Sequence, residues 1–123
     1  MTPARAHGIP GFYLAHEEAD GVPVVRVGGE LDLHAVPELR AAFDKLMEEG
    51  PRALVLDLSE VTFIDSTALG AIVGVHKRLE PEGRLAVVCT NEHVIRIFGY
   101  AGVDELLSIH ETREAALEDV RKT

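Results

Sequence analysis

Strand-like and helix-like segments alternate along most of this chain, and that alternation restricts its fold more than any other feature. Short runs rich in Val, Leu and Ile occur at residues 22–27, 53–58, 84–90 and 106–109. Each is followed by a segment whose apolar residues recur every three to four positions, as in an amphipathic helix. Because right-handed helical crossovers join parallel strands, the sequence predicts an α/β fold with a mainly parallel sheet.

An antiparallel hairpin is predicted ahead of the alternating part. Residues 12–16 are a short strand candidate, and Asp20-Gly21 is a strong turn signal before the Val-rich run. The chain then holds about five strands and about four helices. Its 123 residues suit one domain. We expect that domain to occupy residues 12–123, after a flexible N-terminal tail of residues 1–11.

The predicted helices differ in how much of their surface is apolar. The first has a single apolar stripe that begins at Val36 and continues at helical spacing. The second begins near Ser66 and runs to about Leu79, with apolar residues around most of its circumference, which indicates a buried helix. Gly70 and Gly74 share one face of it, and we expect that face to approach the sheet closely.

Composition and charge limit the classes of function and partner. The chain has 12 basic and 21 acidic residues, a net charge of −9, which argues against nucleic-acid binding. The N-terminal residues lack the apolar core of a signal peptide, and the longest apolar stretch, residues 68–75, is shorter than the roughly 20 residues of a membrane span. Cys89, the single cysteine, lies in a buried-strand pattern. We therefore expect a soluble cytoplasmic protein with no nucleic-acid or membrane partner.

Three adjacent polar residues, Asp65, Ser66 and Thr67, fall where the buried strand 53–58 and its apolar continuation give way to the second helix. Backbone N–H groups at a helix start lack intrahelical partners, and all three residue types commonly cap them. Capping is the simplest interpretation. The same helix end also tolerates a phosphate, because its N–H groups and its dipole favour negative charge. Both interpretations hold if Asp65 or Thr67 caps the helix and Ser66 is modified.

Other kinds of site have little support in the sequence. Ser66, His34 and Asp32 supply the residue types of a serine hydrolase, but the chain has no Gly-x-Ser-x-Gly elbow. The six histidines are scattered without metal-ligand spacing, and Gly28-Gly29 lacks the dinucleotide-binding pattern. We therefore predict that the protein is not an enzyme, with no catalytic residue, no metal site and no cofactor.

Residues 56–70, LDLSEVTFIDSTALG, resemble the signature of the anti-sigma-factor antagonists, which are bacterial STAS domains. Residues 27–32, VGGELD, resemble the family's Gly-Glu-Leu-Asp element. Residues 85–89 and 94–102 resemble its later strand and short helix, and the likeness spans roughly residues 12–118. The resemblance implies a STAS-like mixed, mostly parallel sheet with helices packed on it.

The resemblance also implies a role in partner switching, a form of transcription regulation used in stress responses. An unphosphorylated antagonist binds an anti-sigma factor that is also a serine kinase, and the sigma factor is released. Phosphorylation ends the binding, and a phosphoserine phosphatase resets the antagonist. By matching position, Ser66 is the phosphorylated serine. The residues implied in partner binding are Gly29, Glu30, Asp32, Asp65, Ser66 and Thr67.

The chain departs from the family pattern at Ala68, where many members carry glycine. Glycine would permit a closer backbone approach, whereas alanine suits a helix better. The departure bears on how closely a kinase docks beside Ser66. Two other functions stay open at this point: a STAS-type interaction module of another signalling complex, and a small nucleotide-binding or ligand-binding domain.

Overall fold

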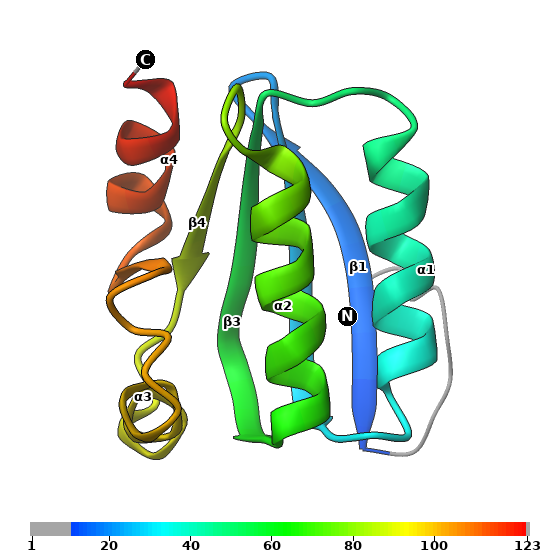
Figure 1. The fold of residues 1–123 in the computed structure, drawn as a ribbon, viewed down its shortest axis with the longest axis vertical. Coiled ribbons are helices and arrows are strands. Elements are labelled where there is room, and N and C mark those ends of the chain that lie inside the picture. The colour runs from blue at the N-terminus through cyan, green and yellow to red at the C-terminus, as the bar shows by residue number, and fades with distance from the viewer. Residues whose placement is uncertain (1–10, 123) are drawn as a thin grey trace.

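A computed structural model describes residues 11–122, which form one five-stranded sheet and four helices (Figure 1). The strands are β1 (Phe12–Ala19), β2 (Val22–Leu31), β3 (Ala53–Ile64), β4 (Arg84–Val88) and β5 (Ser108–His110). The helices are α1 (Val36–Met47), α2 (Ser66–Leu79), α3 (Glu92–Tyr100) and α4 (Arg113–Arg121). The sheet order is β1-β2-β3-β4-β5, with β1 antiparallel to β2 and the other neighbours parallel. The predicted mixed, mostly parallel α/β fold is confirmed.

The two faces of the sheet pack against different helices. Leu54, Leu56 and Leu58 of β3 point into a large core shared with α1, α2 and α3. Val55, between them, belongs to a smaller core shared with α4. Alternate side chains of a strand point to opposite faces, which explains this division.

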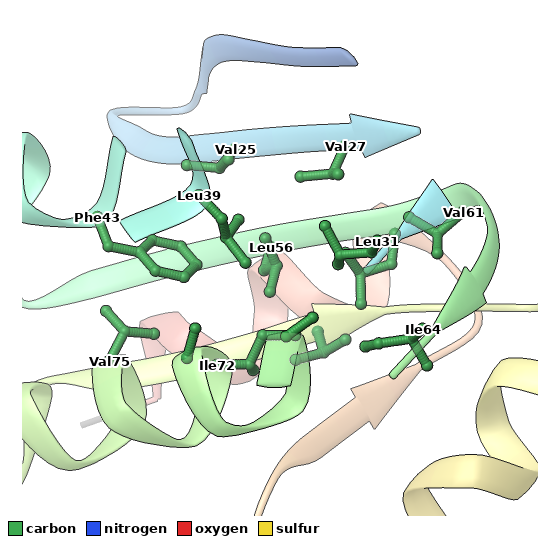
Figure 2. Close-up of a cluster of buried hydrophobic side chains, with 14 of the residues drawn as sticks. Val25, Val27, Leu31, Leu39, Phe43, Leu56, Val61, Ile64, Ile72 and Val75 are labelled. Atoms are coloured by element: carbon green, nitrogen blue, oxygen red, sulfur yellow. The ribbon is translucent and has the colours of Figure 1, made fainter. Parts of the chain in front are cut away.

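The larger core lies between the sheet and the helix pair α1 and α2, which run side by side along it (Figure 1). Figure 2 shows Leu39 and Phe43 of α1 and Ile72 of α2 directed toward Leu56 and Val25 in the sheet. All five side chains are almost completely buried. Burial of such side chains contributes roughly 1.5–3 kcal/mol each, which holds both helices against the sheet.

The carboxyl ends of β2, β3 and β4 lie at one end of the sheet, where α1 and α2 also begin (Figure 1). β2 reaches Leu31, beyond the Val-rich run 22–27, and so includes Gly28 and Gly29. Register shifts against β3 on either side of these glycines absorb them as bulges, so the strand continues. Of the predicted tail, residues 1–10 lie outside the described residues, and the Gly11 carbonyl accepts a hydrogen bond from the Glu30 N–H at 2.7 Å.

The expectation that Gly70 and Gly74 face the sheet is wrong. Gly70 is exposed, Gly74 is half-buried, and a Cβ added to either meets no atom within 4 Å. The sheet-facing side chains of α2 are instead the larger apolar ones: Leu69, Ile72, Val75 and Leu79, with Ala68 and Ala71. Turning these residues inward removes more apolar surface from water, and that orients the helix. One side of α2 is therefore open to solvent along its length.

The ends of the later elements also follow local chemistry. The Asn91 side chain caps α3, accepting from the backbone N–H groups of His93 and Val94, and Thr112 caps α4 in the same manner. Asn and Thr are residue types that commonly cap helices. β4 ends at Val88 and β5 spans residues 108–110, each shifted by about two residues from the predicted bounds.

Within residues 11–122, none of the helices is both long and apolar enough to cross a membrane.

Asp57 of β3 is buried on the face covered by α4, with 5% of its surface exposed. Arg113, at the start of α4, donates to Asp57 Oδ2 from Nη2 at 2.8 Å and to Glu17 of β1 at 2.9 Å. Burial alone raises the pKa of Asp57, but hydrogen bonds from Ser59 and Arg113 outweigh it and hold the pKa below its ordinary value. The carboxylate thus stays ionised and ties α4 to the sheet.

We expect Asp57→Asn to lower the free energy of unfolding by about 2 kcal/mol at pH 7, because the Arg113 guanidinium loses its charged acceptor. The measurement is urea unfolding of both proteins. Because the folded-state pKa is depressed, the advantage of the wild type is full above the ordinary pKa of an aspartate. It shrinks as the pH falls through the folded-state pKa.

Asp44→Asn is the matched control, because Asp44 pairs with Arg78 at 2.7 Å while both side chains are largely exposed. An exposed pair contributes less, so the control should change stability by less than about 1 kcal/mol. Equal losses in the two variants would contradict the role given to Asp57.

Candidate functional site

Asp65 caps α2 and is the residue on which the site is built. Its Oδ1 accepts hydrogen bonds from the backbone N–H groups of Thr67 and Ala68, both at 3.0 Å, and from the Thr67 hydroxyl at 2.6 Å. The Asp65 backbone is extended, as an N-cap requires. Of the two capping residues considered from the sequence, Asp65 is the N-cap, and Thr67 supports it.

The second carboxylate oxygen of Asp65 holds the loop between β2 and α1. Asp65 Oδ2 accepts a hydrogen bond from the Leu33 N–H at 2.9 Å, and the Asp65 N–H donates to the Leu31 carbonyl at 3.2 Å. Asp32 folds the same loop from within, because its Oδ1 accepts from the His34 backbone N–H at 2.9 Å. The two aspartates therefore fix the loop against the first turn of α2.

The Asp65 carboxylate is ionised at neutral pH. Partial burial raises its pKa, but the hydrogen bonds from Thr67, Ala68 and Leu33 together outweigh that effect, and the pKa lies below its ordinary value. A fixed negative charge thus lies next to Ser66. Asp32 is half-buried on the neighbouring loop.

Ser66 is exposed at the first position of α2. Within residues 11–122, its hydroxyl and its backbone N–H make no hydrogen bond. Thr67 is also exposed, but its hydroxyl donates to Asp65. Of the two adjacent hydroxyls, that of Ser66 is the free one, and it can react without disturbing the cap.

Gly29 and Glu30 lie on β2 beside the end of β3, opposite Val61 and Phe63. Gly29 has φ +88°, and a Cβ there would lie 1.9 Å from the Gly11 carbonyl oxygen, so only glycine fits. Its part in the site is to shape the strand. Glu30 is exposed. All six residues predicted for partner binding thus lie at the same end of the sheet.

Two exposed apolar residues at this end were not singled out from the sequence. Leu33 is 58% exposed and Phe63 is 40% exposed. From the sequence, Phe63 falls in the apolar continuation of the strand 53–58. Val61 and Ile64 are both buried in the larger core, and the register of β3 against β2 shifts between the pairs Gly29–Val61 and Glu30–Phe63. This irregularity breaks the alternation of the strand, so a simple period of two would not have found the exposed Phe63.

Ala68 is fully buried in the larger core, and its N–H is bonded to Asp65. Its methyl group therefore points away from the surface that carries Ser66. The departure from the family glycine therefore adds no side chain to that surface.

The chain is similar in sequence and in structure to several known proteins. A family model described as STAS domain matches residues 13–116. The anti-sigma-B factor antagonist of Staphylococcus aureus is 34% identical over 91 residues, 73% of this chain and 84% of that protein. The crystal structure of an anti-sigma factor antagonist from Mycobacterium paratuberculosis is 32% identical with a TM-score of 0.86, covering 94% of this chain and 100% of that one. The Bacillus cell fate determinant SpoIIAA in its phosphorylated form is 26% identical with a TM-score of 0.67, covering 88% and 99%.

We expect Asp65→Ala to lower the free energy of unfolding by about 1–2 kcal/mol, because α2 loses its cap. The Leu33 amide should also exchange with solvent much faster, since Asp65 Oδ2 accepts its hydrogen bond. Chemical denaturation and amide hydrogen exchange measure the two effects. Thr67→Ala is the control, because it leaves Oδ2 in place and should keep the Leu33 amide protected. Unchanged protection in Asp65→Ala would show that Asp65 does not hold the loop.

Proposed function

This chain belongs to the STAS domain family, and from that premise we propose that it is an anti-sigma factor antagonist switched by phosphorylation of Ser66. Two of the similar proteins are named as anti-sigma factor antagonists. The third is a protein whose structure was solved in its phosphorylated form. The observation that carries the proposal is the free, exposed Ser66 hydroxyl beside the ionised cap Asp65. The proposed partner is an anti-sigma factor with serine kinase activity, opposed by a phosphoserine phosphatase.

The modification is a phosphoryl transfer from ATP. Ser66 Oγ attacks the γ-phosphorus, the new Oγ–P bond forms, and the bond to ADP breaks. The hydroxyl proton passes to a base on the kinase. In-line transfer requires the γ-phosphorus to lie about 3–3.5 Å from Ser66 Oγ before reaction, so the nucleotide phosphates face Ser66 in the complex.

Phosphorylation then places new negative charge where negative charge already lies. Phosphoserine carries about −1.5 to −2 at pH 7. In the complex it would be enclosed between the Asp65 carboxylate and the nucleotide phosphates. A buried charge without a partner costs about 3–5 kcal/mol. At 1.4 kcal/mol per tenfold, the affinity falls roughly a hundredfold to a few thousandfold.

No refolding is needed for this effect. The cap and the loop are held by the side chain of Asp65, and the Ser66 side chain takes no part in them. The unphosphorylated and phosphorylated chains therefore share one fold and differ in the charge of one surface. The phosphatase restores binding by removing that charge.

We expect ATP and the anti-sigma factor kinase to label Ser66, with phosphate mapped by mass spectrometry. Ser66→Ala should stay unlabelled and bind the partner whether or not ATP is present. Ser66→Asp should bind at least tenfold more weakly, because it carries part of the added charge. Thr67→Ala is the control and should still be labelled. Label on Thr67 instead of Ser66, or tight binding by Ser66→Asp, would refute the proposal.

A further inference from the structure

Four large apolar side chains are well exposed among residues 11–122: Leu33, Phe63, Tyr100 and Leu106. Two of them adjoin Asp65. The Leu33 N–H is bonded to Asp65 Oδ2, and Phe63 precedes Asp65 by two residues on β3. Single apolar residues are common on protein surfaces, but apolar groups gathered at one site mark places where another molecule is bound. Leu33 and Phe63 thus both lie at the end of the sheet that carries Ser66.

Leu33 and Phe63 both belong to segments whose backbone is held by hydrogen bonds or strand pairing. The Leu33 loop is held by Asp65 and by the Asp32 turn. Phe63 lies opposite Glu30 in the parallel pairing of β2 and β3. Anchors on ordered backbone lose little conformational freedom when a partner binds, so more of their burial contributes to affinity. Their placement suits the centre of an interface.

The formally charged residues in the two segments that carry Leu33 and Phe63 are all acidic. Residues 29–34 and 62–67 contain Glu30, Asp32 and Asp65 but no Lys or Arg. Glu30 is exposed and Asp32 is half-buried. A complementary surface would therefore be apolar at its centre and basic at its border.

The switch restricts where that basic border lies. A cation facing Ser66 would bind the phosphorylated form more tightly, which is the reverse of the proposed response. The partner's basic side chains are therefore expected to pair with Glu30 and Asp32 and not to face Ser66.

We infer that Leu33 and Phe63 are the anchors by which the chain docks on its anti-sigma factor, whose matching surface is an apolar pocket bordered by basic side chains near Glu30 and Asp32. This inference rests on the proposed function. It divides the surface into two parts. Leu33 and Phe63 supply affinity in either phosphorylation state, and Ser66 supplies the switch.

The test uses the full chain and the purified anti-sigma factor that transfers phosphate from ATP to Ser66. Leu33→Ala and Phe63→Ala should each raise the Kd of the unphosphorylated form about thirtyfold, as expected of central anchors. The KM of each variant as a phosphorylation substrate should rise with little change in kcat. Leu33→Met and Phe63→Leu should restore most of the affinity, because they keep an apolar group in the pocket.

Leu106→Ala is the matched control. Leu106 is 43% exposed, like Leu33 and Phe63, but it lines a shallow cavity with His76, Glu80 and Pro81 at the opposite end of α2. Its replacement should change the Kd less than about twofold, as expected away from the interface centre. Thermal unfolding of each variant checks that the fold is kept. Salt should weaken binding of the wild type, as a basic border requires.

The outcomes separate this inference from the proposed function. In one outcome the wild type binds and loses binding on phosphorylation, while Leu33→Ala and Phe63→Ala bind with a Kd within twofold of the wild type. That result would refute the role of Leu33 and Phe63 as anchors and would leave the proposed function supported. If Leu106→Ala weakens binding as much as they do, the docking surface is misplaced. If no anti-sigma factor binds the unphosphorylated wild type, the proposed function fails and this inference fails with it.

Discussion

The two-sided hydrogen bonding of Asp65 is the constraint on which the rest of the site depends. One carboxylate oxygen caps α2 and the other holds the loop that leads into α1, so a single side chain joins β2, β3 and both helices at one end of the sheet. Because Asp65 takes the capping role, Ser66 is left with a free hydroxyl at the surface. The residue next to the proposed modification site thus has a structural role, whereas the Ser66 side chain has none.

The rigidity of this end comes from the core beneath it. Leu31, Ile64 and Ala68 are almost fully buried at the ends of β2 and β3 and the start of α2, so the site is built on packed elements. The opposite face is held separately, by the ion pair that ties Arg113 of α4 to buried Asp57. Ser66 belongs neither to this core nor to this ion pair, so a charge added at Ser66 removes no contact from either. The structure therefore suits a switch that changes what the surface attracts and leaves the fold unchanged.

Most of the architecture could be predicted from the sequence because it follows from local patterns. The leucines of β3, the apolar stripe of α1 and the caps Asn91 and Thr112 each have a period or a position that specifies their role. What could not be predicted depends on contacts between distant residues. The bulges at Gly28-Gly29 need β3 alongside, the outward turn of Gly70 follows from how α2 packs, and the role of Leu33 needs Asp65 across the loop. The choice of Asp65 over Thr67 as the cap likewise required the geometry.

The central claim is that phosphate on Ser66 ends partner binding through local charge. Calorimetric titration of the anti-sigma factor with fully phosphorylated and unphosphorylated wild-type chain tests it most directly, with amide spectra recorded on both samples. The account predicts that the Kd of the phosphorylated form is higher by roughly a hundredfold to a few thousandfold. Spectral changes should be confined to residues 29–34 and 62–69. Equal Kd values for the two forms, or a phosphorylated chain that has lost its fold, would contradict it.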